Sequence, residues 1–241
     1  MPEQIPPELA HNLHAFRTTE AIDLYSVYLL YPEEKVLFAK HYKPGDRILD
    51  LACGMGRTTL CLHEMGLLVT GVDASVEFIE TAKKRLPYLE LRVGSYDRIE
   101  EPDASFSHVL ISCNGIDYAF PESQRLAALR ECARVLKPGG TLIYSSHNLK
   151  SLHFFSPRYR GRIIWKSRQT LKAFRQRAYV LETGLYTLYT SRDFVIQQTE
   201  KVGLRFLELT WLRMIGCEPI DRYFSPYLYY VFTKRADAQS G

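Results

Sequence analysis

The stretch Ile48-Leu49-Asp50-Leu51-Ala52-Cys53-Gly54-Met55-Gly56, followed by Gly71-Val72-Asp73, decides the fold of this chain. The first part is apolar apart from Asp50, which is typical of a strand covered on both faces. Its two closing glycines let the backbone approach a ligand, and a helix N-terminus follows them. The second part ends a strand with Asp73, where a carboxylate can accept hydrogen bonds from both ribose hydroxyls. This pattern predicts a nucleoside-binding site.

Strands and helices alternate from this point for about a hundred residues. We predict helices at 57–65, 75–86 and 123–136, and strands at 47–52, 67–72, 88–93, 106–112 and 141–146. Lys137-Pro138-Gly139-Gly140 is a helix stop and turn before the fifth strand. Strands separated by helices of this length imply right-handed crossovers and a doubly wound parallel sheet.

The last part of the chain follows a different pattern. A helix is predicted at 190–202, and then two strands at 204–212 and 227–233 with no helix between them, so the pair is antiparallel. We therefore predict the α/β class, with a doubly wound, mostly parallel sheet of seven strands. The 241 residues, 46% of them hydrophobic, fit one domain, 1–241, with a full core.

Composition narrows the classes of protein and of site. The net charge of +4 is too small by itself to indicate a nucleic-acid partner. No apolar run reaches the roughly 18–20 residues that cross a bilayer, and residues 1–17 lack a signal peptide's apolar core, so we expect a cytoplasmic protein. Five cysteines without a C-x-x-C pair argue against disulfides and a zinc site, and we expect no metal.

The glycine turn alone does not identify the nucleoside. An NAD enzyme has a third glycine where this chain has Thr59. However, Asp50–Gly56 resembles the first motif of class I S-adenosylmethionine-dependent methyltransferases, Val72–Ser75 their second-strand acid, and Ser107–Ser112 their fourth strand. Arg134-Val135-Leu136-Lys137-Pro138-Gly139-Gly140 resembles their turn into the fifth strand, and this turn is not found there in dehydrogenases. The resemblance covers 47–148 strongly and 190–233 in outline.

The resemblance implies S-adenosylmethionine as cofactor and assigns roles by position. The backbone of Ala52, Gly54 and Gly56 would hold the methionine part, and Asp73 the ribose, with Ala74 beside it. The exit of the third strand, Ser95-Tyr96-Asp97, would contact adenine, and Cys113 and Asn114 after the fourth strand would lie near the transferring methyl. Many members have an acid where this chain has Ser95, so Asp97, or Ser95 with the backbone, would serve the adenine amino group.

Catalytic candidates cluster where the fourth and fifth strands end, since ligands bind beyond the carboxyl ends of such sheets. His147 could act as a base or orient the acceptor, and Asn114 could orient the acceptor or bond the cofactor. Tyr118 lies close to them along the chain and is a candidate substrate contact. The alternative for His147 is a structural histidine bonded to nearby backbone.

The chain has two further segments that could shape the acceptor pocket. Residues 1–42 are predicted to form a helical cover whose helix, 19–30, carries Tyr25 and Tyr28 on one face, either as pocket aromatics or as core. Residues 149–189 hold nine of the 31 basic residues and one of the 27 acidic ones, a net +8 against −4 elsewhere. Within this basic lid a helix is predicted at 163–178, with Arg168, Lys172 and Arg175 along one flank.

These features together predict methyl transfer to nitrogen or oxygen of a small, anionic metabolite. Nitrogen is slightly preferred, because no base–nucleophile pair is visible in the sequence. The alternatives are a methyltransferase that acts on RNA or lipid through the basic insert, and a non-catalytic nucleoside-binding partner subunit. No appended RNA-binding module is visible, which counts against nucleic acid. The acceptor and the oligomeric state stay open.

Overall fold

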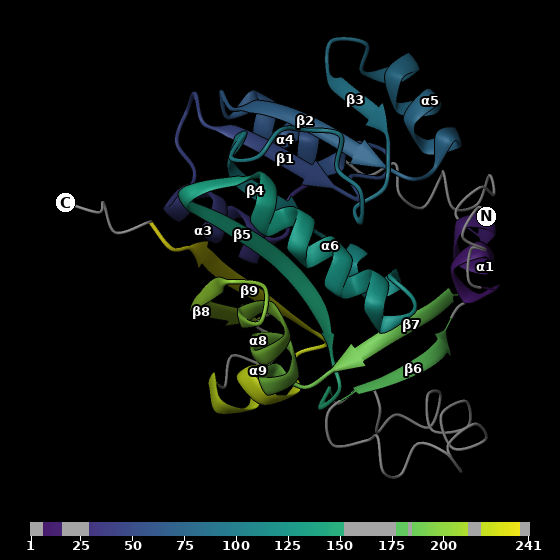
Figure 1. Ribbon diagram of the computed structural model, residues 1–241, viewed down its shortest axis with the longest axis vertical. Helices are drawn as coiled ribbons and strands as arrows, with labels where there is room; N and C mark the ends of the chain where they lie inside the picture. Colours follow the sequence, from purple (N-terminus) through teal and green to yellow (C-terminus); the bar gives the residue numbers. More distant parts are fainter. Residues whose placement is uncertain (1–6, 16–28, 152–176, 183–184, 212–217, 237–241) are drawn as a thin grey trace.

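The computed structural model describes residues 7–15, 29–151, 177–182, 185–211 and 218–236. A twisted central sheet runs through them, with helices packed on both of its faces (Figure 1). Within the described residues the sheet has nine strands, and its main path is β3-β2-β1-β4-β5-β7-β6, with β9 joining β5 and β8 joining β9.

The first five strands form the predicted parallel unit. They are β1 (Arg47–Leu51), β2 (Leu68–Asp73), β3 (Glu90–Val93), β4 (Phe106–Ile111) and β5 (Leu136–Asn148). The crossover helices are α4 (Arg57–Glu64), α5 (Val76–Arg85) and α6 (Glu122–Val135). As predicted, α5 begins at a serine, because the Ser75 hydroxyl accepts a hydrogen bond from the Phe78 amide at 3.1 Å. The predicted turn at 137–140 is instead assigned to the start of β5, where the register against β4 shifts.

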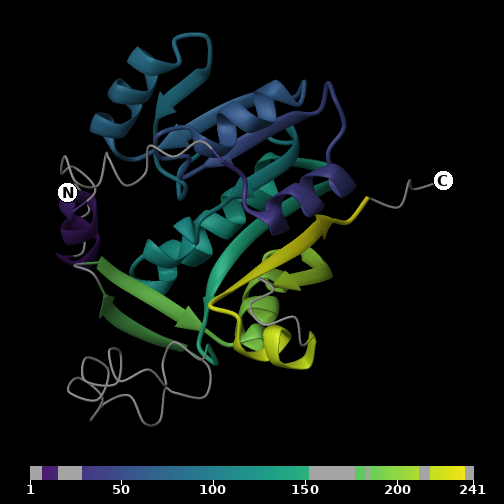
Figure 2. The same ribbon diagram turned by 180° about the vertical axis from the view of Figure 1, so that it is seen from behind.

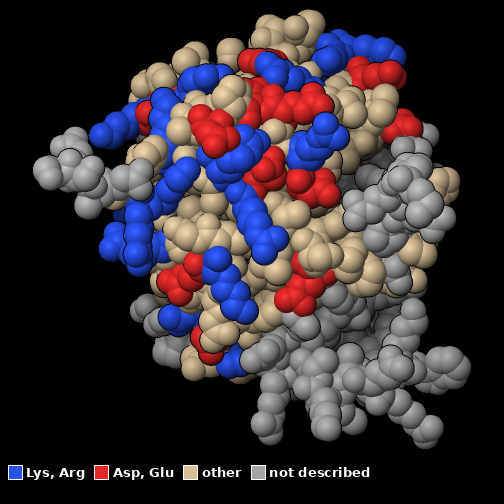
Figure 3. Space-filling model, viewed as in Figure 1, with Lys and Arg blue, Asp and Glu red and all other residues tan. Residues whose placement is uncertain are grey.

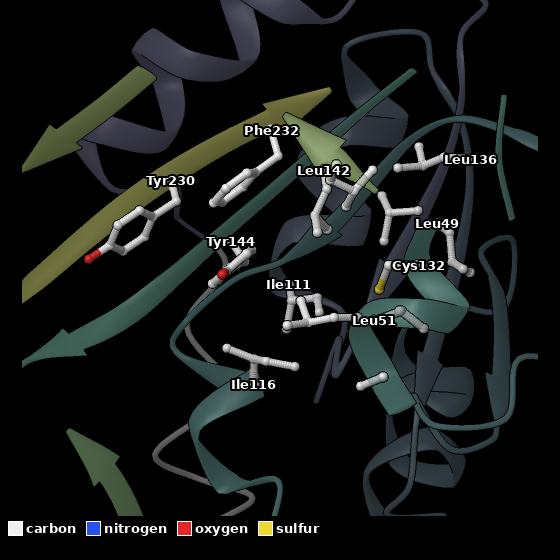
Figure 4. Packing of buried hydrophobic residues seen from close by; sticks show 14 of the residues in the cluster. Leu49, Leu51, Ile111, Ile116, Cys132, Leu136, Leu142, Tyr144, Tyr230 and Phe232 are labelled. Atoms are coloured by element: carbon white, nitrogen blue, oxygen red, sulfur yellow. The ribbon is translucent and has the colours of Figure 1, made fainter. Parts of the chain in front are cut away.

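Alternate residues of the central strands point to opposite faces, which explains why their sequences are continuously apolar. Leu49 and Leu51 of β1 belong to the core under α6 and α8, whereas Ile48 belongs to the core under α3 and α4. In the first of these cores, Tyr144 of β5 stacks on Phe232 of β9 at 5.7 Å between ring centroids and 9° between planes (Figure 4). The aromatic rings of β5 and β9 are therefore closely packed in this core.

The C-terminal part confirms the predicted antiparallel pair. Helix α8 (Arg192–Glu200) ends before Gly203, and β8 (Leu204–Trp211) then pairs with β9 (Tyr227–Lys234). A short helix, α9 (Glu218–Phe224), precedes β9. Strand β9 inserts beside β5, from Thr141 opposite Thr233 to His147 opposite Tyr227.

Two strands beyond the predicted seven lie in the basic insert. β6 (Arg177–Glu182) and β7 (Leu185–Thr190) form an antiparallel hairpin, and β7 pairs in parallel with the end of β5. The prediction of a helix up to residue 178 is wrong at its end, because 177 and 178 belong to β6. These residues form a strand because of the sheet beside them. β5 continues past the end of β4, which leaves an edge that an added strand can pair with. The rest of that helix, 163–176, lies outside the described residues.

The N-terminal part contributes two described helices, α1 (Pro7–Ala15) and α3 (Pro32–His41). Asn12 joins α1 to the hairpin, because its side chain donates to the Tyr186 carbonyl at 2.8 Å and accepts from the Tyr186 amide at 2.7 Å. Viewed from behind, α3 lies beside β9 while α1 lies beside β7 (Figure 2). Among the described residues, no helix combines the length and apolar character needed to cross a bilayer.

Candidate active site

The glycine turn between β1 and α4 is built from left-handed backbone. Ala52, Gly54 and Gly56 have φ of 54°, 55° and 82°, and Gly56 is the residue from which α4 starts. Glycine adopts such angles without steric cost, which explains two of these three positions. A Cβ on Gly54 would meet no atom closer than Phe78, 3.9 Å away. The turn therefore presents bare backbone to the space in front of it.

Asp73 closes this turn from the tip of β2. One carboxylate oxygen accepts from the Gly54 amide and the other from the Ser75 amide, both at 2.8 Å. Burial raises the pKa of the Asp73 carboxyl, and the backbone amides of Ser75, Gly54 and Ala74 act in the opposite direction. Each oxygen accepts one hydrogen bond from the backbone and has lone-pair capacity left for a ligand.

A cavity of about 660 Å³ opens in front of the turn, at the carboxyl ends of the strands. Its walls include predicted site residues from four loops: Ala52, Gly54, Asp73, Ala74, Ser95, Tyr96, Cys113 and Tyr118. Three other predicted residues, Gly56, Asp97 and Asn114, do not line it. Leu29, Leu30 and Tyr31 complete the wall from the N-terminal segment. Its size and mainly apolar lining are those of a small-molecule site.

Two of the non-lining residues support the wall from behind. Asp97 accepts a hydrogen bond from the Ser95 hydroxyl. The backbone of Asn114 is left-handed, with φ of 59°, and its backbone amide donates to the Ser145 hydroxyl at 2.8 Å. The buried Oδ1 of Asn114 has no hydrogen-bond partner among the described residues. Gly115 next to it is close to the glycine turn, since a Cβ there would lie 2.7 Å from that of Ala52.

Thr59 has a structural role that explains why the third glycine is absent. The hydroxyls of Thr58 and Thr59 both donate to Asp50 Oδ2, at 2.6 and 2.7 Å. Close approach between helix and sheet is provided by Gly71 on β2 instead, where a Cβ would lie 2.9 Å from Thr59 Oγ1. Gly71 on the neighbouring strand thus takes the place of the third glycine of dinucleotide-binding proteins.

Asp50 should make the stability depend on pH. Burial raises the pKa of its carboxyl to about 6 from the ordinary 3.8, and its Oδ1 has no partner among the described residues. The folded protein therefore binds the proton more tightly than the unfolded chain, and stability falls as the pH rises from about 4 to 6, by at most about 3 kcal/mol. Urea unfolding at several pH values, compared with Asp50→Asn, checks this. A variant with the same pH dependence as the wild type would contradict it.

A buried ion pair beside the cavity is not evident from the sequence. Arg57, the first residue of α4, makes two hydrogen bonds of 2.7 Å to the Glu34 carboxylate on α3. It also donates to the Leu29 carbonyl at 2.8 Å and lies 4.9 Å from the centre of the Tyr31 ring. Glu34 further accepts from the Ser112 hydroxyl and the Tyr31 amide. These contacts fix the N-terminal segment over the cavity.

A second buried polar cluster surrounds His147, the predicted catalytic residue. His147 does not line the cavity, but its ring lies 6.4 Å from that of Tyr118, which does. Its Nδ1 is 2.9 Å from Asp117 Oδ2. Asp117 also accepts from Arg125 at 2.7 Å and from Ser146 at 2.8 Å. The His147 ring therefore bonds a carboxylate, and the backbone amide of His147 donates to the same carboxylate. Tyr25, Tyr28, Arg168, Lys172 and Arg175 lie outside the described residues.

Comparison with known proteins agrees with this geometry. Residues 48–140 match the family model described as "Methyltransferase domain". These residues form a methyltransferase domain with the class I fold. The glycine turn, Asp73 and the exits of β3 and β4 all belong to this methyltransferase domain, whereas α1, α3 and the β6–β7 hairpin lie outside it.

Similar sequences match over part of the chain. The chain is 35% identical over 106 residues to YqeM of Bacillus subtilis, covering 42% of each. It is 37% identical over 101 residues to a demethylmenaquinone methyltransferase of Beutenbergia cavernae, covering 42% of this chain and 40% of that protein. The chain thus spans about two fifths of the curated relatives that it matches.

Solved structures resemble the chain over more of its length. A 1,6-didemethyltoxoflavin-N1-methyltransferase of Burkholderia thailandensis, solved with bound 1,6-didemethyltoxoflavin and S-adenosylhomocysteine, has a TM-score of 0.67 at 14% identity. It covers 98% of this chain and 92% of its own. An S-adenosylmethionine-dependent methyltransferase of Methanosarcina mazei has a TM-score of 0.65 at 20% identity, covering 86% and 99%. At these identities the likeness establishes the fold.

Proposed function

We propose that this chain transfers a methyl group from S-adenosylmethionine to nitrogen or oxygen of a small, anionic metabolite. The observation that carries the proposal is Asp73, whose carboxylate lies at the tip of β2 beside the bare backbone of Gly54, on the wall of the cavity. The bound cofactor would supply an activated methyl group on a sulfonium. The protein would then chiefly have to orient the acceptor and exclude water.

The cavity wall fits an adenosine in two ways. The lone pairs left on the Asp73 carboxylate would accept bonds from the ribose hydroxyls. Val72, Ala74, Phe78 and Tyr96 supply apolar surface for a base on the same side. Ser95 and Asp97, hydrogen-bonded to each other, would serve the adenine amino group.

The other end of the cavity would hold the methionine part and the acceptor. Ala52 and Gly54 would direct backbone toward the methionine part, with Cys113 near the methyl. Leu29, Leu30 and Tyr31 would keep water out, because Arg57 and Glu34 hold that segment against the opening. Tyr118 would then contact the acceptor.

The anionic character of the acceptor is proposed from charge alone. The net +8 of residues 149–189 favours an anionic acceptor. On the face seen in Figure 3, by contrast, the described Lys and Arg side chains are interspersed with Asp and Glu. Such a mixed surface gives a polyanion little to bind. RNA binding that weakens steeply with salt would favour the nucleic-acid alternative.

Asp73→Asn should weaken S-adenosylmethionine binding by about 1–3 kcal/mol, since one acceptor oxygen becomes a donor. Titration calorimetry with S-adenosylmethionine, S-adenosylhomocysteine and NAD measures this. Asp103→Asn is the matched control, because that carboxylate is exposed and pairs with Arg134 far from the cavity wall. A preference for NAD, or equal cofactor affinity in Asp73→Asn and wild type, would contradict the proposal.

Screening metabolite pools with isotope-labelled S-adenosylmethionine would identify the acceptor. Transfer to small carboxylates or phosphates is the expected result. Label that appears only in RNA or lipid would refute the small-molecule proposal. Binding of the cofactor with no labelled product in any pool would favour a non-catalytic subunit.

A further inference from the structure

The cluster around His147 fixes one tautomer of its imidazole. Asp117 is fully buried and accepts four hydrogen bonds: from Arg125, from Ser146, and from the backbone amide and Nδ1 of His147. Because the carboxylate is paired with Arg125 and can only accept, Nδ1 must carry the proton. The lone pair of a neutral His147 is therefore on Nε2.

The sheet topology places His147 near the carboxyl end of β5, past the end of its pairing with β4. His147 is opposite Tyr227 of β9 and also opposite Tyr189 of β7. Since a strand has two edges, β7 must occupy the edge that β4 has left, next to the turn η1 (Gly115–Tyr118) that carries Asp117. The Asp117 carboxylate thus joins the segment that follows β4 to the end of β5, where it bonds His147.

Aromatic rings enclose the imidazole. The ring centroids of Tyr189, Tyr227 and Tyr118 lie 4.8, 5.4 and 6.4 Å from that of His147. The side chain is 11% exposed, and its Nε2 has no hydrogen-bond partner among the described residues. A ring nitrogen with an available lone pair, surrounded by flat rings of which Tyr118 lines the cavity, suits a flat ligand with a hydroxyl.

We propose that His147 is the catalytic base for a hydroxyl acceptor, a phenol or enol bound against Tyr118, and that Asp117 is its positioning residue. The inference rests on the proposed function and deepens it. As the acceptor oxygen forms its bond to the methyl carbon, the S–CH₃ bonding pair leaves with sulfur, and the hydroxyl proton passes to Nε2. The products are a methyl ether, neutral S-adenosylhomocysteine and an imidazolium, which then loses its proton to water.

A hydroxyl acceptor explains the His147–Asp117 pair better than an amine acceptor does. A neutral amine attacks through its own lone pair and needs no base, whereas a hydroxyl becomes a strong nucleophile only as its proton leaves. The sequence favoured a nitrogen acceptor only because no base is visible in it. Within the described part of the chain, the groups that face His147 are Asp117, with Arg125 behind it, and the tyrosines of η1, β7 and β9. The carboxylate that bonds His147 is thus already paired.

The first test reads the tautomer and needs no acceptor. Nitrogen-15 NMR of the protein loaded with S-adenosylhomocysteine, at a pH where histidine is neutral, should show His147 as Nδ1–H, assigned by its loss in His147→Gln. Asp117→Asn should reverse it to Nε2–H, because the amide can donate to Nδ1. A wild-type Nε2–H tautomer overturns the proposal, and this result does not depend on whether Asp117→Asn folds.

The second test uses para-nitrophenol as the probe, because its absorbance reports its ionisation. In the S-adenosylhomocysteine complex, wild type should bind it as the phenolate at a pH where it is a phenol in solution. His147→Gln should lose this signal, and His63→Gln, an exposed histidine on α4, should keep it. An equal signal in His147→Gln, or bound phenol in wild type, overturns the proposal.

Turnover gives the third measurement. For hydroxyl acceptors found in the metabolite screen, kcat/KM should fall about 100-fold or more in His147→Gln. It should also fall in Asp117→Asn. Calorimetry with S-adenosylhomocysteine distinguishes failure of the proposed function from failure of the base proposal. If wild type does not bind S-adenosylhomocysteine, the proposed function fails. If binding is normal but His147→Gln turns hydroxyl acceptors over within about threefold of wild type, only the base proposal fails.

Discussion

Arg125→Met is expected to lower the free energy of unfolding by about 3–5 kcal/mol, as is usual when one partner of a buried ion pair is removed. Arg125 and Asp117 are both fully buried, at 2.7 Å from each other. Arg125 also donates to the Ile116 carbonyl at 2.9 Å and to Gln198 Oε1 at 2.8 Å. The substitution would leave an uncompensated carboxylate and two buried acceptors. Urea unfolding followed by circular dichroism measures the effect.

Arg130→Met is the matched control for this experiment. It lies on the same helix, α6, but is exposed, so its removal should change stability by less than about 0.5 kcal/mol. Equal losses in the two variants would show that helix composition, rather than the buried pair, decides the outcome. A small loss for Arg125→Met would mean that Ser146 and His147 alone satisfy Asp117.

Arg57→Met is expected to have a similarly large effect, about 3–5 kcal/mol, with a second consequence in the cavity. Glu34 is completely buried and would lose both of its hydrogen bonds to the guanidinium. The Leu29 carbonyl and the Tyr31 ring would lose the same partner, so the segment that closes the cavity would be held less firmly. Urea unfolding gives the first effect, and limited proteolysis near residue 30 the second.

The control for Arg57 is an exposed ion pair of the same type. Arg92 pairs with Glu90 and Glu101, and its side chain is 52% exposed, so Arg92→Met should cost no more than about 1 kcal/mol. The double variant Glu34→Leu with Arg57→Met should recover part of the loss, because no unpaired charge remains. Strictly additive losses in that double variant would contradict a direct interaction.

Local patterns predicted the parallel unit well. The apolar runs, the serine at the start of α5 and the glycine turn are properties of neighbouring residues, so the sequence displays them directly. The same holds for Ala52, Gly54, Asp73 and Ala74 on the cavity wall. Gly56, predicted as part of the binding backbone, instead faces Leu86 and Leu91. Which of the turn residues faces the ligand is set by packing that the motif does not display.

Distant pairings could not be predicted in the same way. Glu34 has the pattern of an ordinary acid in the first turn of a helix, and its partner Arg57 is 23 residues away. Asp117 lies 30 residues from His147 along the chain, and only the parallel pairing of β4 with β5 brings them together. The β6–β7 hairpin was missed because it depends on the edge of β5 that extends past β4. Sequence reasoning found His147 by its position but not the carboxylate that orients it.

The Asn12–Tyr186 link joins segments 174 residues apart, and this separation affects the order of assembly during synthesis. The glycine turn and Asp73 lie within residues 47–148, which are synthesised before the C-terminal part of the chain. The rim at Asn12 can close only after residue 186 has emerged, and long-range closures of this kind are slow. A nascent chain halted between these points would contain the glycine turn and Asp73 but could not make the Asn12–Tyr186 link.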